Sequence, residues 1–387
     1  MEFFRNTNIK FLKYKFVAFA VSGAIILSGL IYIKQKGINY GIDFVGGTLL
    51  QIKFKEPVKI DELRKKMKTI GFADARIQAV ENLEDEYLIR VERIAKKVQA
   101  TAEEEYLVVA RKIERALMSE EEKKQLNEGK LNLNTISFEE LKNLLLKKFP
   151  EQQAQTYASR ILEFRKQNKI IHSFEELAKL EIPKSAIDEL KKSTFIGSFS
   201  TLRVEVVGPQ VGKTLRHKAT LATVWALFGM LLYIAFRFRP LYGISAVLTL
   251  FHDVLVVLAF IAFLQIEFSL PVVAAILTIV GYSINDTIVI FDRVRENLPL
   301  LRRKKEQDFE ELLNKSINQT LSRTILTSGT TLLALLSLYL LGGAVIKGFA
   351  LTLLIGIIVG TYSSIYQSCA YLALWNKAYG LKGLMKK

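Results

Sequence analysis

The sequence predicts an α-helical polytopic membrane protein with six transmembrane helices and one α+β domain outside the membrane. Two observations carry this prediction. Half of the 387 residues are hydrophobic, and they gather in runs that are long enough to cross a bilayer. One polar block, residues 34–218, separates the first run from the others. The only cysteine, Cys369, falls in the last run, so the polar block must hold together through a core without disulfides.

Each apolar run is close to the roughly 20 residues that span about 30 Å of hydrocarbon. The six predicted spans are 16–33, 219–236, 241–264, about 268–291, about 325–341 and about 349–375. The division into domains that follows is an N-terminus at 1–15, helix one at 16–33, the polar block, helices two to six within 219–375, and a C-terminus at 376–387.

The basic residues predict the orientation of the spans. The chain has a net charge of +16, from 54 Lys and Arg against 38 Asp and Glu, but the polar block holds only 35 against 28. More than half of the excess therefore lies in short segments before span one, between spans two and three, between four and five, and after six. With six spans, all four segments fall on one side, which the positive-inside rule assigns to the cytoplasm. We expect both termini to be cytoplasmic and the polar block to be extracytoplasmic.

Residues 34–118 and 194–218 of the polar block predict a ferredoxin-like domain. Strands are expected at 41–55, 75–80, 87–91 and 202–207, and helices at 58–70 and 95–117. In the first helix, Leu63, Met67 and Ile70 recur on one face, as in an amphipathic helix. The resulting order, β-α-β-β-α-β, is the ferredoxin-like one.

Residues 119–193 interrupt this order before the last strand and predict a separate helical insert. The sequence Ser-Phe-Glu-Glu-Leu at 137–141 returns at 173–177, and Thr135 and Ser173 are expected to cap the two helices. The insert resembles the tandem helix-hairpin-helix module of the ComEA competence proteins, whose Gly-hydrophobic-Gly hairpins present backbone amides to DNA phosphates. The corresponding hairpins here lack those glycines. A protein-contact or spacer role is therefore favoured over nucleic-acid binding.

Several predicted spans contain polar side chains that are costly in hydrocarbon, about 2.5–3.5 kcal/mol for each charged one. Span three contains His252 and Asp253, and span four contains Asn285 and Asp286. In span five, polar residues recur every three or four positions and predict one stripe along the helix; they are Ser316, Gln319, Arg323, Thr327 and Thr330.

These residues are candidates for an ion relay. A carboxyl group in a low dielectric takes up or releases a proton as a guanidinium moves toward or away from it, which makes Asp286 and Arg323 the central pair. Asn285, Gln319 and Thr327 are weaker members of the same site. The alternative is an ion pair that only fastens two helices. For His252 and Asp253, a relay role and a helix-packing role are equally open.

Six motifs in order resemble the SecF family, the smaller membrane partner of SecD in bacterial protein translocation. They lie at 41–48 (Gly-Ile-Asp-Phe-Val-Gly-Gly-Thr), 207–212, 280–287 (with Asn-Asp-Thr), 291–297, 316–324 (with Ser-Arg-Thr) and 360–365. The resemblance covers nearly the whole chain except the insert, which departs from the usual pattern.

The resemblance implies an RND-type half-transporter in the bacterial cytoplasmic membrane. Besides membrane lipid, its implied partners are SecD, the SecYEG channel and the exported unfolded polypeptide, and its energy source is the proton-motive force, or sodium in some relatives. It also implies that Asp286 and Arg323 belong to the ion path. The alternative is half of an RND-type exporter of a small amphipathic molecule. No enzyme, cofactor or metal is expected, because the sequence shows no nucleophile–base set, Cys/His cluster or phosphate-binding loop.

Overall fold

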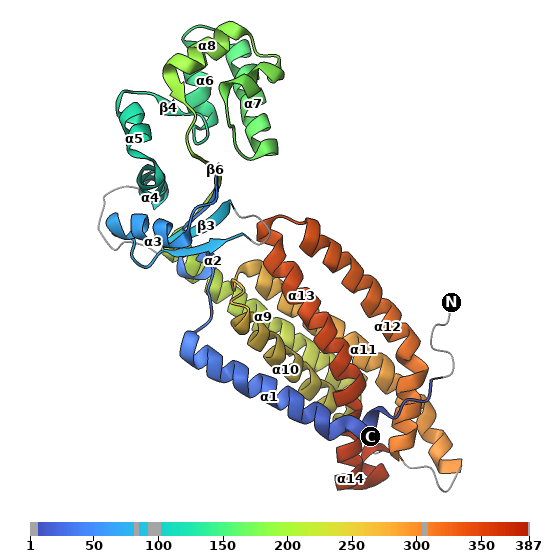
Figure 1. Cartoon of the computed structure of the whole chain (residues 1–387). Helices are drawn as coiled ribbons and strands as arrows, with labels where there is room; N and C mark the ends of the chain where they lie inside the picture. The colour runs from blue at the N-terminus through green and yellow to red at the C-terminus, as the bar shows by residue number, and fades with distance from the viewer. Residues whose placement is uncertain (1–6, 81–84, 92–101, 304–308, 386–387) are drawn as a thin grey trace. The chain divides into compact units, whose positions relative to one another are not determined.

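The computed structural model describes residues 7–80, 85–91, 102–303 and 309–385. The chain forms two compact units, one of residues 1–41 with 215–387 and the other of residues 42–214. Each unit has hydrophobic cores of its own. The first unit contains almost all of the apolar helices, and the second contains the sheet and the insert (Figure 1).

Six helices in the described residues are long and apolar enough to cross a membrane, and each overlaps one predicted span. They are α1 (Lys15–Lys36), α9 (Pro209–Arg237), α10 (Pro240–Phe263), α11 (Leu270–Arg303), α12 (Phe309–Leu341) and the continuous segment of α13 (Ala344–Ser363), the π-helix η3 (Ser364–Ser368) and α14 (Cys369–Met385). Several extend beyond the apolar run, because polar residues continue the helix; α12 begins at Phe309, well before residue 325.

Small residues let the central helices approach one another closely. A side chain at Gly29 of α1 would overlap Ala259 of α10, and one at Gly356 of α13 would overlap Ile279 of α11. Gly360, one turn further along α13, would place a Cβ 3.2 Å from that of Ser283. Such contacts are typical of helix packing in membranes, where van der Waals contact replaces the hydrophobic effect. They bring the polar side chains of four helices within hydrogen-bonding reach.

The basic segments meet at one end of the membrane unit. Lys15, at the start of α1, forms an ion pair with Glu310 at the start of α12. Arg237, at the end of α9, pairs with Asp292 on the last turns of α11, with 2.6 Å between Nη2 and Oδ2. The positive-inside argument requires this clustering. Which side of a membrane this end faces stays a prediction.

The segment that follows α1 is fixed at the opposite end. Tyr40 and Phe268 form a short parallel bridge, in which the Gly41 amide donates to the Phe268 carbonyl at 2.9 Å and the Phe268 amide donates to the Asn39 carbonyl at 2.7 Å. The chain therefore leaves α1 beside the loop that joins α10 to α11.

The second unit contains the β-α-β-β-α-β order. Its elements are β1 (Gly47–Phe54), α3 (Ile60–Thr69), β2 (Arg76–Ala79), β3 (Glu86–Val91), α4 (Ala102–Leu117) and β6 (Phe199–Val207). Residues 95–101 of the predicted second helix lie outside the described residues. The predicted start of the first strand was wrong: Ile42–Val45 form the short helix α2, and the strand begins only at Gly47. Both glycines have positive φ, 75° and 133°, which other residues rarely adopt.

The four strands pair in the order β2-β3-β1-β6, and all neighbours are antiparallel. Each helical crossover therefore skips one strand, as in a split βαβ arrangement. The core between the sheet and its two helices contains Leu50, Ile52 and Ile89 from the strands, Met67 from α3 and Ile113 from α4, all essentially without solvent exposure.

The insert has its own helices and its own core. Its elements are α5 (Glu120–Asn127), β4 (Leu131–Asn132), α6 (Phe138–Leu146), α7 (Glu151–Asn168), the 3-10 helix η2 (Phe174–Leu180), α8 (Lys184–Ser193) and β5 (Thr194–Phe195). The predicted cap at Thr135 was wrong, because Ser137 caps α6 in a reciprocal capping box with Glu140. Ser173 does precede η2, but its side chain accepts no capping bond there. The helix-hairpin-helix identity of the insert stays a prediction.

Polar contacts join the insert to the sheet domain. Lys169 forms an ion pair with Glu86, whose side chain is 1% exposed. The Ser198 hydroxyl donates to Glu122 at 3.2 Å. The Asn134 amide donates to the Gly197 carbonyl at 3.2 Å. The insert therefore has an apolar core of its own, apart from Leu126 of α5, which packs against the core of the sheet domain, and a hydrogen-bonded seam joins the two.

Candidate functional site

Asp286 is buried on α11, and Arg323 lies on the neighbouring helix α12. The Asp286 side chain is 4% exposed, and its Oδ2 atom has no hydrogen-bond partner among the described residues. Arg323 is the cation whose charge acts on this carboxyl group. Even so, no ion pair within 4.0 Å joins the two residues in the described part of the chain. The alternative of a fastening ion pair is therefore not the arrangement in this structure.

A second buried polar atom without a partner lies on α12. The Thr324 hydroxyl, next in sequence to Arg323, makes no hydrogen bond among the described residues although the residue is 1% exposed. Nearby, the Ser328 hydroxyl is 2.8 Å from that of Thr361 on α13. Unsatisfied polar atoms are uncommon in protein interiors and indicate strain, function or a bound water or ion.

The predicted stripe on α12 is mostly exposed in the single chain. Gln319, Arg323, Thr327 and Thr330 lie on the uncovered side of α12. Asn285, beside Asp286, is also exposed.

Two weaker relay candidates make contacts away from Asp286. The Thr327 hydroxyl donates to the Arg323 carbonyl on its own helix at 3.0 Å. The Gln319 side chain accepts from Asn297 at 2.8 Å, nearer the basic end of α11. These contacts tie the two side chains to positions other than the Asp286 carboxyl group.

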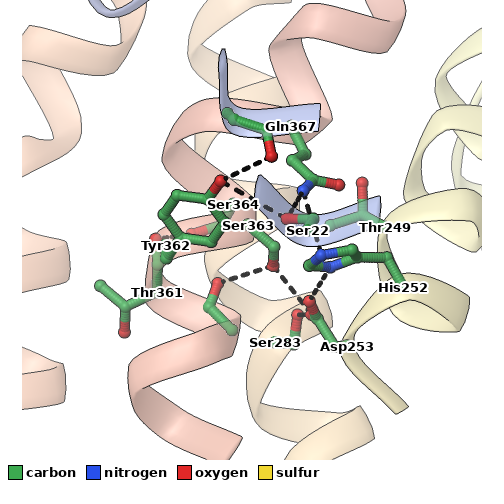
Figure 2. A network of polar contacts seen from close by, with 12 residues as sticks. Ser22, Thr249, His252, Asp253, Ser283, Thr361, Tyr362, Ser363, Ser364 and Gln367 are labelled. Carbon is green, nitrogen blue, oxygen red and sulfur yellow. Dashed lines mark hydrogen bonds and ion pairs between the residues drawn. The ribbon is translucent and has the colours of Figure 1, made fainter. Parts of the chain in front are cut away.

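His252 and Asp253 form the centre of a separate buried network (Figure 2). His252 is 6% exposed and Asp253 is fully buried. The Asp253 carboxylate interacts with His252 Nδ1 at 2.9 Å and accepts hydrogen bonds from Ser283 of α11 and Ser363 of α13, the latter at 2.9 Å. Two residues that adjoin in sequence thus connect three helices.

Gln367 extends this network to α1. Its Nε2 atom lies 3.0 Å from His252 Nε2 and donates to the Ser22 hydroxyl at 2.6 Å. Gln367 belongs to the π-helix η3, a distortion that is frequent at functional sites because it re-aims side chains. The Ser22 hydroxyl lies 3.5 Å from that of Tyr362 (Figure 2).

The sequence did not place Ser22, Ser363 or Gln367 in a common site with His252. Ser22 is a small polar residue in an apolar run, and such residues usually bond within their own helix. The π-helix has no sequence signature that would reveal it. The one available signal in the sequence is the spacing of small residues at Gly356, Gly360 and Ser364, which favours close helix approach but does not name the partner helix.

Comparison with known proteins gives the class. The C-terminal domain of SecD/SecF protein export membrane proteins matches residues 186–378, and the SecD/SecF GG motif matches residues 35–58. The chain is therefore a protein-export membrane protein of the SecD/SecF class.

Full-length relatives give the family within that class. The Protein translocase subunit SecF of Koribacter versatilis is 40% identical, over 99% of this chain and 95% of the relative. That of Desulfurispirillum indicum is 35% identical over 98% and 96%. The chain belongs to the SecF family of protein translocase subunits. The predicted resemblance to the SecF family, the membrane fold and the SecF-like function are confirmed. The alternative, half of an exporter of a small amphipathic molecule, is not favoured.

A solved structure supports the fold. The crystal structure of SecDF from Thermus thermophilus, described as a translocon-associated membrane protein, aligns with a TM-score of 0.65 at 30% identity, covering 96% of this chain and 39% of that one. A SecDF in a super-membrane-facing form aligns with a TM-score of 0.55, covering all of this chain and 41% of that one. In both structures this chain aligns with about two fifths of the longer SecDF chain.

Proposed function

We propose that this SecF-family chain pairs with SecD and couples ion movement through the membrane to export of an unfolded polypeptide from the SecYEG channel. The observation that supports the proposal is the buried Asp286 carboxyl group, one oxygen of which has no hydrogen-bond partner among the described residues, next to a helix that carries Arg323. A buried carboxylate without a bonded cation needs a proton, an ion or water, since isolated buried charge is strongly unfavourable. Such a carboxyl group can take up and release a proton or another cation.

In this proposal, Arg323 is the movable charge. When its guanidinium approaches Asp286, the ionised carboxylate is stabilised and a proton leaves; when it withdraws, the proton returns. The coupling is reciprocal, because protonation also weakens the attraction that holds Arg323 in place. A proton that crosses 100 mV supplies about 2.3 kcal/mol, which is roughly a 50-fold bias of a conformational equilibrium.

The exposed polar stripe of α12 fits an interface with SecD. Gln319, Arg323, Thr327 and Thr330 would face hydrocarbon if the chain stood alone, which is costly for the charged one. A partner helix bundle with polar groups of its own would cover them. We propose the same orientation as the charge pattern predicts, with both termini cytoplasmic and residues 42–214 outside the cytoplasmic membrane, where they meet the emerging polypeptide.

The test is export into membrane vesicles that contain SecYEG, SecD and this chain, with and without a proton-motive force. Asp286→Asn is expected to abolish the part of export that the ion gradient stimulates, while SecD still copurifies. Because no ion pair within 4.0 Å holds Asp286 among the described residues, the change should leave stability within about 1 kcal/mol of wild type. Glu296→Gln, which neutralises an exposed acid on the same helix, is the matched control.

Two further variants separate the relay from a structural role. Arg323→Lys should also impair coupling, because an ammonium lacks the planar, bidentate geometry of the guanidinium. The double variant Asp286→Asn with Arg323→Gln should be stable and inactive. Ion-stimulated export that survives in this charge-free variant would show that the relay lies elsewhere.

A further inference from the structure

We propose that His252 is a second proton-binding centre of this chain, and that the Gln367 side-chain amide switches orientation with its charge. The inference rests on the proposed function only in that it supplies the ion pathway with another titrating group. The geometry itself stands apart from Asp286, because it is built from α10, α1, α11, α13 and η3 around Asp253.

The orientation of the Gln367 amide decides which ring nitrogen of His252 carries the proton. Gln367 Nε2 can only donate, so the facing atom, His252 Nε2, is the acceptor and carries no proton. The imidazole proton is therefore on Nδ1 and is donated to Asp253 at 2.9 Å. With the amide in this orientation, the imidazole is neutral and its proton is on Nδ1.

The hydrogen bonds around Asp253 stabilise an ionised carboxylate, which can balance a positive charge. Its carboxylate accepts from three donors, the His252 ring and the hydroxyls of Ser283 and Ser363, which is the pattern of an ionised acceptor-only group. In the described residues no Lys or Arg forms an ion pair with it. A proton on His252 would turn a buried pair of net charge −1 into a neutral one.

Protonation requires the amide to turn, and its surroundings allow this. A proton on His252 Nε2 would point at the Gln367 NH₂ group; rotation of the amide by half a turn brings Oε1 to accept it. The other two neighbours of this amide are hydroxyls, Ser22 at 2.6 Å and Tyr371 at 3.5 Å, and a hydroxyl can donate or accept. Ser22 would donate to Oε1 and Tyr371 would accept from Nε2, so both orientations are satisfied.

The groups that could compete for the proton are few. The most direct competitor is the Asp253 carboxyl group, 2.9 Å from the ring. Among the described residues, the other titratable side chains in contact with the network are Tyr362, which bonds to the Ala18 carbonyl of α1 at 3.1 Å, and Tyr371 of α14. On α1 and α11 the contacting groups are the hydroxyls of Ser22 and Ser283. The Ser22 bond also joins α1 to the π-helix, so a turn of the amide changes a contact between two helical segments.

The experiment is ¹⁵N NMR of histidine-labelled full-length protein in lipid nanodiscs, titrated from pH 4 to pH 10. The chain has three histidines, and the other two, His172 and His217, are exposed and serve as internal references. Their signals are assigned with His172→Gln and His217→Gln. At high pH, we expect His252 as the Nδ1–H tautomer, and at lower pH we expect one proton added at Nε2.

Variants then test the partners. Asp253→Asn should lower the proton affinity of His252 at least tenfold, because the balancing charge is lost. Gln367→Met, which keeps the length but accepts no hydrogen bond, should lower it at least tenfold while leaving the Nδ1–H tautomer at high pH. Both references should stay unchanged.

Three outcomes would overturn the proposal: a His252 that stays neutral over the whole range, an Nε2–H tautomer at high pH, or a proton affinity unaffected by Gln367→Met. Displacement of the proton by sodium chloride but not by choline chloride would also overturn it, in favour of a cation site. Because the titration needs no translocation, it can fail while the Asp286→Asn export test succeeds, and the reverse.

Discussion

The ion pair between Lys169 and Glu86 joins the insert to the sheet, and we expect Lys169→Met to open this seam. Glu86 is 1% exposed at its side chain, and among the described residues the remaining partners of that side chain are Gln51 at 3.2 Å and Lys53 at 4.0 Å. Lys53 is itself bound to Asp85 at 2.6 Å. Loss of Lys169 therefore leaves a buried carboxylate with one distant cation that it shares with another acid.

The magnitude follows from this geometry. Removing one partner of a fully buried ion pair costs about 3–5 kcal/mol. The Lys169 side chain is 41% exposed, so solvent already screens its charge, and Lys53 keeps part of the attraction. Two unit charges 4 Å apart attract by about 4 kcal/mol at an effective dielectric constant of 20, and we expect about half of that to be lost. A change of about 2 kcal/mol in the free energy of opening is roughly 30-fold in hydrogen exchange.

Hydrogen exchange of the full-length protein, read on peptides that cover β3 and the end of α7, measures this opening. Lys179→Met removes an exposed lysine of the same insert and is the matched control. The double variant Glu86→Gln with Lys169→Met should recover more than half of the free energy of opening that Lys169→Met loses, because the buried carboxylate charge is gone. If the double variant is as destabilised as the sum of its single changes, the seam is not held by this charge pair.

Three more outcomes are expected. A cysteine at Ser185 should react with an impermeant thiol reagent in intact spheroplasts, whereas one at Lys377 should react only after lysis. The native Cys369 is buried and should not interfere. The reverse labelling would contradict the orientation that the positive-inside rule predicts. The chain should show no salt-sensitive DNA binding through its insert. Micromolar DNA binding would refute this if it weakens steeply with salt and is lost when Lys147 and Lys148 are neutralised. Burial raises the pKa of Glu114, which the Thr201 hydroxyl bond at 2.6 Å opposes. The stability that protonated Glu114 contributes is present at low pH and is lost as the pH rises through the raised pKa. The unfolding free energy of residues 42–214 should therefore fall as the pH rises above the ordinary carboxyl range, and Glu114→Gln should make this fall smaller. Identical pH profiles of the variant and the wild type would refute this.

Burial also changes the pKa of a charged residue beside the seam between the insert and the sheet domain. It lowers the pKa of Arg165 to about 10, and the neighbouring Glu114 carboxylate opposes this shift. Arg165 thus stays charged at neutral pH, where its guanidinium donates to the carbonyls of Leu133 and Ile136 at 3.0 and 2.9 Å. The insert therefore fixes its own loop with a cation rather than offering that cation to a ligand.

The sequence by itself determined the spans, the α+β order and the helical insert, because these depend on local pattern. A run of apolar residues of membrane length has one stable solution in lipid, a helix that satisfies its own backbone. The strand start at Gly47 was missed because positive φ at Gly46 and Gly47 admits a turn that the apolar pattern does not encode.

The tertiary structure alone decided which polar side chains meet. Asp286 and Arg323 lie on adjacent helices, but no ion pair within 4.0 Å joins them in the described residues. Ser22 and Gln367 are 345 positions apart, yet their side chains are 2.6 Å apart, because Gly29 and Gly356 let whole helices approach. Helical periodicity states which residues share a face. Which faces touch depends on packing summed over many residues distant in the chain, and no local pattern contains that sum.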